Sequence, residues 1–175
     1  MRAERARTAL ASHGLEALPA LLRLAQSETP DDRWWALRCL AEVYHPHADD
    51  SLLRGLYDAE VSVRQAAALA LRDRPLAAAI PRLASMLDSA DSLLSRLAGD
   101  ALAAMGSVAS PALAEAARSS SAATRIGAVR ALAFNQDPDA VPALYAALDD
   151  DSSMVEHWAE DGLERRGLGM VYFPP

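Results

Sequence analysis

The sequence predicts an all-α fold, a right-handed α-solenoid of about five two-helix repeats preceded by an N-terminal helix. Two observations carry this prediction. A motif of two small residues around a variable pair, followed by leucine, recurs at intervals of 31, 31, 30 and 31 residues, starting at Ala36, Ala67, Ala98, Ala128 and Ala159. A second marker keeps the same period at Pro19, Asp50, Pro81, Pro111 and Pro142. A fixed period of this size indicates stacked supersecondary units.

Each repeat is predicted to consist of two helices joined by a short polar turn. The first helix, as in Asp139–Asp149, has a proline in its first turn, where the missing N–H does little harm. The second, as in residues 63–73, repeats small or apolar residues at i, i+4 and i+8. We expect Asp and Ser residues of the turn to cap it. The repeats occupy residues 15–167 of a single domain spanning 1–175, between a leading helix at 1–14 and a tail at 168–175.

Composition and charge narrow the class of protein. The hydrophobic content of 51% can build a sizeable core, yet no apolar run reaches the roughly 18 residues of a membrane span. All 17 basic residues are arginine, which is typical of a GC-rich genome such as that of many bacteria. The single cysteine, Cys39, fits a reducing compartment, so we expect a cytoplasmic protein with no membrane partner. The net charge of −7 disfavours general nucleic-acid binding.

The segment DAEVSVRQAAALAL, Asp58–Leu71, resembles the second helix of a HEAT repeat. The short period is similar to that of the phycobilisome-lyase type of HEAT-like repeat. This resemblance implies a ladder of hydrogen bonds between successive turns, formed here by Arg33, Asp58, Arg64 and Arg125. The ladder is expected to be partial, because other repeats depart from the signature: the arginine slot holds Ser95 and Glu156, and the acid slot holds Ser27, Ser89 and Ser119.

Two adjacent tryptophans fall in different columns of the aligned repeats. The column of Trp35 contains Ala66, Leu97, Gly127 and Trp158, all apolar or small, which predicts a buried position. The column of Trp34 is mostly polar and predicts an exposed ridge. In the resembled family the second helices line the concave surface, which makes this ridge the expected partner-binding site, unless the leading helix covers Trp34. The predicted partner-binding residues are Trp34, Arg38, Gln65, Leu69, Arg72, Arg96, Arg130 and His157.

Catalytic and metal-binding patterns are weak. The turn HPHADD, His45–Asp50, gathers metal-capable side chains, but no second cluster completes a zinc site, and Asp49 or Asp50 is expected to cap the next helix. Deoxyhypusine hydroxylases with HEAT-like repeats use repeated His-Glu pairs, whereas this chain has one reversed pair, Glu156-His157. We therefore predict no catalytic residue, no metal and no cofactor, which favours a role other than an enzyme.

The function predicted from these patterns is a protein-interaction module or adaptor. A subunit of a chromophore lyase or maturation factor is the alternative, and a HEAT-like nucleic-acid-binding protein is a third. The last repeat, Asp149–Arg166, carries seven acids and two arginines, whereas residues 1–14 carry three arginines and one acid, so weak head-to-tail self-association is also open. The apolar tail LGMVYFPP either caps the solenoid or inserts into another molecule.

Overall fold

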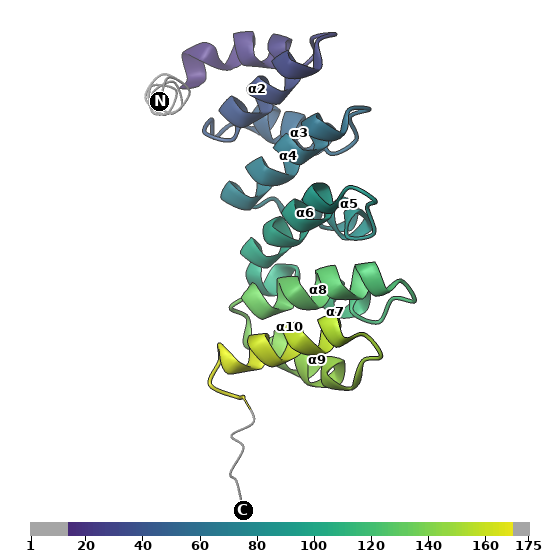
Figure 1. The fold of residues 1–175 in the computed structure, drawn as a ribbon. Helices are drawn as coiled ribbons and strands as arrows, with labels where there is room; N and C mark the ends of the chain where they lie inside the picture. The colour runs from purple at the N-terminus through teal and green to yellow at the C-terminus, as the bar shows by residue number, and fades with distance from the viewer. Residues whose placement is uncertain (1–13, 170–175) are drawn as a thin grey trace, which may run out of the picture. The chain divides into compact units, whose positions relative to one another are not determined.

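The computed structural model describes residues 14–169, and within them it contains helices and no strand (Figure 1). The predicted all-α fold of paired helices is confirmed. None of the described helices is both long and apolar enough to cross a membrane. Most of the leading helix, and residues 170–175 of the tail, lie outside the described residues.

The helices alternate between the first and second members of successive repeats. The first members are the helical residues 14–24, α3 (Pro46–Gly55), α5 (Ile80–Met86), α7 (Ser110–Ala116) and α9 (Val141–Ala146). The second members are α2 (Pro30–Leu40), α4 (Val61–Asp73), α6 (Ser92–Ala104), α8 (Ala122–Phe134) and α10 (Ser153–Glu164). Short 3₁₀ turns extend several first helices: η1 (Ala77–Ala79), η2 (Gly106–Val108), η3 (Pro138–Ala140) and η4 (Ala147–Asp149).

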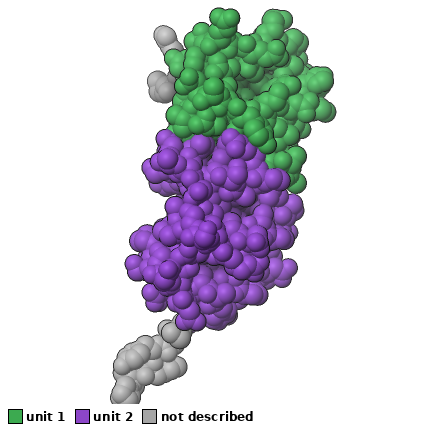
Figure 2. Space-filling view, turned by 90° about the vertical axis from the view of Figure 1, so that its right-hand side faces the viewer, with its two compact units in different colours: residues 1–79 green, residues 80–175 purple. Residues whose placement is uncertain are grey.

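The chain divides into two compact units, Met1–Ala79 and Ile80–Pro175 (Figure 2). The first unit contains α2 to α4, with α2 packed on α4, and the second contains α5 to α10, with α8 packed on both α6 and α10. The expected single domain stays a prediction, and each unit is described by itself.

The leucine that closes each copy of the repeat motif lies in the core. Leu40 and Leu71 are fully buried in unit 1, and Leu102 and Leu132 in unit 2, while Leu163 is 3% exposed. Leu52 of α3, Leu56 directly after it, Leu113 of α7 and Leu144 of α9 are also fully buried. The leucine is therefore a core residue in every repeat, and this is why the motif recurs so regularly in the sequence.

The turns before the second helices use one recurring hydrogen bond. A side-chain oxygen at the acid slot accepts from the main-chain N–H two residues later, as in Glu60 N to Asp58 Oδ1 at 2.9 Å and Ser121 N to Ser119 Oγ at 3.1 Å. The same bond forms at Ser27, Ser89 and Asp150. Serine and aspartate both supply this oxygen, so the serines that depart from the family signature keep the turn.

Helix capping follows the prediction at two turns. Asp91 caps α6 by accepting from Leu94 N, and Ser121 caps α8 by accepting from Thr124 N. The N-cap residues Glu60 of α4 and Ser152 of α10 make no side-chain cap bond. In those turns the preceding aspartate fixes the chain instead.

Two of the four expected ladder residues, Arg33 and Asp58, meet in unit 1. The guanidinium group of Arg33 binds Asp58 at two points, Nε to Oδ2 at 2.7 Å and Nη2 to Oδ1 at 2.8 Å, and Nη1 donates to the carbonyl oxygens of Ser27 and Glu28. Arg64 uses the same carbonyl geometry, with bonds to the main-chain oxygens of Asp58 and Ala59. Each arginine therefore closes its own turn, and only a following aspartate converts it into a link between repeats.

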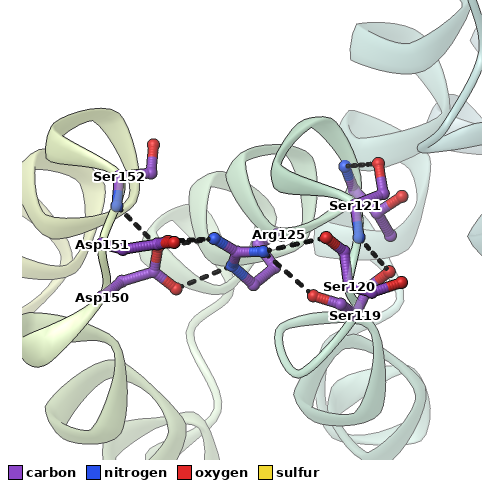
Figure 3. Close-up of polar contacts among 8 residues, drawn as sticks. Ser119, Ser120, Ser121, Arg125, Asp150, Asp151 and Ser152 are labelled. Atoms are coloured by element: carbon purple, nitrogen blue, oxygen red, sulfur yellow. Dashed lines mark hydrogen bonds and ion pairs between the residues drawn. The ribbon is translucent and has the colours of Figure 1, made fainter.

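The same link recurs in unit 2 around Arg125 (Figure 3). Arg125 Nε lies 2.8 Å from Asp150 Oδ2 and Nη2 lies 3.0 Å from Oδ1, while Asp151 is a further partner. The hydrogen bonds from Arg125 lower the pKa of Asp150, and those from Arg33 lower the pKa of Asp58. In the turn of the preceding repeat the acid slot holds Ser119, which cannot form this ion pair. There Asp88 links the two repeats by accepting hydrogen bonds from the hydroxyls of Ser121 and Thr124.

A second connection between repeats was not foreseen from the sequence. The guanidinium group of Arg166 donates to the carbonyl oxygens of Leu132, Ala133 and Asn135 at the C-terminal end of α8. In unit 1, buried Arg74 likewise donates to the carbonyl oxygens of Leu40 and Val43 after α2. The last carbonyls of a helix have no N–H partner four residues further along the helix, so an arginine from the next repeat can donate to them, although Leu40 O also accepts from Val43 N at 3.0 Å.

Candidate binding faces on the second helices

The predicted partner-binding residues lie on the second helices of both units. In unit 1 Trp34, Gln65 and Leu69 are partly buried, and Arg72 is exposed. In unit 2 Arg96 and His157 are exposed, and Arg130 is partly buried. The face is therefore accessible in each unit, although to different depths.

The prediction that Trp35 is buried and Trp34 is exposed is wrong. Trp35, expected in the core, is 48% exposed, whereas Trp34 is partly buried. The rings meet edge to face, with centroids 4.8 Å apart. Leu97, Gly127 and Trp158, in the same column as Trp35, are only partly buried. This column therefore lies at the edge of the contact between neighbouring repeats. A small residue such as Ala66 is covered there, but an indole ring is too large and extends into solvent.

Charged residues on the face of unit 1 pair across α2 and α4. Arg38 Nη1 lies 3.9 Å from Asp73 Oδ2, and Arg72 Nη2 lies 3.0 Å from Asp73 Oδ1. Asp73 thus stands between two arginines of the predicted ridge. The pairing leaves this face of unit 1 with both signs of charge.

In unit 2 the second helices bring together two arginines and two aromatic rings, which we call the arginine–aromatic cluster: Arg130, Phe134, Trp158 and Arg165. The Phe134 and Trp158 ring centroids are 6.0 Å apart. The guanidinium carbon of Arg165 lies 4.5 Å from the Phe134 centroid, and that of Arg130 lies 5.4 Å from Phe134 and 5.8 Å from Trp158. These distances are within cation–π range.

Two aspartates hold the arginines of the cluster. Arg130 Nη2 lies 2.8 Å from Asp100 Oδ1 on α6, and Arg165 Nε lies 2.5 Å from Asp161 Oδ2 one turn before it on α10. The bond to Asp161 raises the pKa of Arg165. Phe134 nevertheless remains 41% exposed, and the exposed His157 ring lies 5.2 Å from Trp158. The result is a fixed aromatic surface with charged groups at its border.

Only Arg130 and His157 of this neighbourhood were predicted as binding residues. Phe134 and Arg165 were missed, and Trp158 was placed in a buried column. A usable signal existed, because Arg130 and Phe134 are four residues apart, as are Asp161 and Arg165, and such pairs share a helix face. The meeting of α8 with α10, however, joins residues far apart in the sequence, which no spacing within one helix reveals.

Metal-capable side chains are not gathered into one centre in the part of the chain that the structure describes. No group of three or more His, Cys, Asp or Glu side chains is placed to hold a metal among residues 14–169. In the HPHADD turn, His45 caps α3 by accepting from His47 N, so the expectation that Asp49 or Asp50 caps this helix is wrong. Asp49 instead pairs with Arg74, because the helix starts at Pro46, before either aspartate.

The pairing of helices, the repeated turn and the inter-repeat arginines define an α-solenoid repeat protein. The chain belongs to the HEAT-repeat family, since the sequence profile of HEAT repeats matches residues 2–72 and 80–164. No curated protein matches its sequence.

Several solved structures share the fold. An archaeal HEAT-like repeats protein from Thermococcus onnurineus NA1 is similar over 99% of this chain and 79% of its own, with a TM-score of 0.63 and 17% identity. A chain of the CpcE–CpcF complex of phycocyanin lyase from Nostoc sp. PCC7120 is similar over 91% and 69%, with a TM-score of 0.55 and 22% identity. A designed armadillo repeat protein in complex with the peptide (KR)4 is similar over 90% and 84%, with a TM-score of 0.59 and 20% identity. At these identities the likeness establishes the fold alone.

Proposed function

We propose that this protein is an interaction module that binds a partner protein through the exposed face of its second helices. The observation that carries the proposal is the arginine–aromatic cluster of unit 2. Aromatic and arginine side chains supply most interface hot spots. Because stacking and ion pairs already fix these four side chains, little side-chain entropy is lost when a partner covers them.

The free hydrogen-bond donors of the cluster indicate the chemistry of the partner. Within the described residues, Arg165 uses only its Nε for an ion pair, and its side chain is 49% exposed. Arg96, also exposed, has no ion pair within residues 14–169. A carboxylate beside an apolar side chain would satisfy Arg165 while covering Phe134. We therefore propose a partner segment in which an acidic residue neighbours an apolar one.

In unit 1 the proposed contact residues are Trp34, Arg38, Gln65, Leu69 and Arg72, with Trp35 added because this residue is 48% exposed. An exposed tryptophan supported edge-on by a second ring is a rigid, apolar anchor of the kind that partner proteins bury. The charge pairs around Asp73 favour a segment of mixed charge here, in contrast to the acidic segment proposed for unit 2.

Quantitative affinity purification from the native host tests this function. Wild-type protein, the double variant Phe134→Ala/Trp158→Ala and the control Val108→Ala are compared by mass spectrometry. Val108 is 60% exposed and lies on η2, which is not part of a second helix. The proposal expects partners that the control retains and the double variant loses, with unchanged helical content by circular dichroism. Equal recovery of every protein by the two variants would contradict it.

A subunit of a chromophore lyase or maturation factor is the second candidate, favoured by the fold shared with the phycocyanin lyase chain. This role requires that the protein, or a complex of it with a partner subunit, carry or transfer a tetrapyrrole. Co-expression with a bilin and gel filtration would test it through a visible absorption band that elutes with the protein. A HEAT-like nucleic-acid-binding role is the least favoured, and a salt-dependent shift of labelled DNA would bring it forward. We propose a cytoplasmic location for any of these roles.

A further inference from the structure

Unit 2 contains a small apolar pocket on a different side of α10 from the arginine–aromatic cluster. Its floor is formed by Tyr145, Leu148, Leu163 and Leu168, and two glutamates of α10, Glu160 and Glu164, line it. Tyr145 is 47% exposed and Leu168 is 42% exposed. The volume of about 130 Å³ is too small for a typical organic cofactor, but it can admit one or two side chains of another polypeptide.

The glutamates of this pocket depart from the repeat. The column of Glu160 holds Leu37, Ala68, Gly99 and Val129, and each of these four is buried. Glu160 is exposed, and so are Glu164 one turn after it and Glu156 one turn before it. Within residues 14–169 these three carboxylates have no ion pair or side-chain hydrogen bond. The helix position that is buried in the other repeats thus carries in the last one an exposed carboxylate, Glu160, that is unpaired within the described residues.

Charge complementarity selects the kind of occupant. The pocket fits a segment with small apolar side chains for the floor and cationic side chains for the glutamates. Residues 170–175 contain no basic residue, so the tail of the chain does not meet this requirement. Residues 1–13, MRAERARTALASH, carry Arg2, Arg5 and Arg7 among alanines and a leucine, with one acid. They lie outside the described residues, and only their sequence enters here.

We propose that the Glu160–Glu164 pocket is a docking site for residues 1–13 of a second copy of this protein. Because each copy offers both the pocket and the basic segment, two copies can exchange segments reciprocally, and further copies can extend the same contact into chains. Exposed ion pairs are screened by salt, so association is expected at low ionic strength and high protein concentration. This association goes beyond the proposed partner binding and uses a different surface of α10.

Binding of a labelled peptide to the full-length protein tests the proposal. A synthetic peptide of residues 1–13 with a fluorophore at its C-terminal end is titrated with protein, and its anisotropy is measured. The proposal expects binding that weakens about tenfold or more between ~50 mM and ~500 mM salt. Glu160→Gln/Glu164→Gln and Leu168→Ser should each weaken binding at least about fivefold, whereas Glu115→Gln, a matched exposed glutamate of α7, should not.

Sedimentation velocity supplies the second measurement. The weight-average sedimentation coefficient of wild-type protein should rise with concentration at low salt and stay constant in the Glu160→Gln/Glu164→Gln variant. A constant coefficient for wild type, equal binding by the variant, or displacement of the labelled peptide by the tail peptide MVYFPP would each overturn the proposal. Because all these substitutions leave Phe134 and Trp158 in place, their outcome is independent of the affinity purification.

Discussion

Arg33 and Asp58 form a two-point ion pair between side chains 25 residues apart, with N–O distances of 2.7 and 2.8 Å. Asp58 also accepts from Glu60 N, so one carboxylate joins the turn of its own repeat to the second helix of the repeat before. Arg125 and Asp150 repeat this arrangement in unit 2.

Stability at acid pH should depend on the Arg33–Asp58 pair. Hydrogen bonds from Arg33 lower the pKa of Asp58 in the folded state, so the stabilisation is present above the unfolded-state pKa of about 3.9. It is lost as the pH falls through the lower, folded-state value. Urea unfolding at pH ~6 and pH ~3 should show a smaller acid-induced loss of unfolding free energy for Arg33→Gln than for wild type. Arg118→Gln, at an exposed pair, should behave as wild type.

The carbonyl-binding arginines should be required for stability in a way that lysine does not replace. Arg166 donates to four main-chain oxygens from two nitrogens, Nη1 and Nη2. Arg166→Met should lower the free energy of unfolding by about 1–3 kcal/mol, because buried carbonyls lose their donors. Arg166→Lys should recover less than half of this loss, since an ammonium group cannot span the same acceptors. Full recovery by lysine would show that charge alone matters there.

The close approach of α8 to α10 should make the stability of the protein sensitive to substitution of one glycine. A Cβ atom at Gly162 would lie 2.9 Å from Ala133 Cα and 3.0 Å from Leu144 Cδ1. Gly162→Ala is therefore expected to cost about 1–3 kcal/mol through overpacking. At Gly99 the nearest atom to an added Cβ lies 3.5 Å away, an ordinary contact. Gly99→Ala should be neutral or stabilising, because alanine favours a helix. Thermal melts of both variants decide the comparison.

Trp35→Ala should cost little stability despite the size of the side chain. A tryptophan removed from a core costs about 3–5 kcal/mol, but Trp35 is 48% exposed and its edge-to-face contact with Trp34 is of the order of 1 kcal/mol. Trp34→Ala should cost more, because Trp34 is less exposed. Chemical denaturation of the two single variants measures the difference. A larger loss for Trp35→Ala would reinstate its assignment to the core.

A large-to-small substitution in the repeat motif should show where the core lies. Leu132 is fully buried, and Leu132→Ala should lower the free energy of unfolding by about 2–5 kcal/mol. Leu93, on α6 but 50% exposed, serves as the control, and Leu93→Ala should stay within about 0.5 kcal/mol of wild type. Similar losses at both positions would contradict the burial pattern.

The sequence by itself determined the repeat, the pairing of helices and the buried leucines Leu40, Leu71, Leu102, Leu132 and Leu163, because these features recur at one period and each copy reports the same contact. It also indicated the turns, where serine and aspartate provide the same acceptor oxygen. Only the tertiary structure decided which individual side chains differ in burial from the equivalent residues of the other repeats. Trp35 is exposed where Ala66 is buried, since an indole does not fit the space that a methyl group fills. The arginine–aromatic cluster and the Arg166 contacts depend on how closely α8 and α10 approach each other, and the spacing of residues along one helix carries no information about that distance.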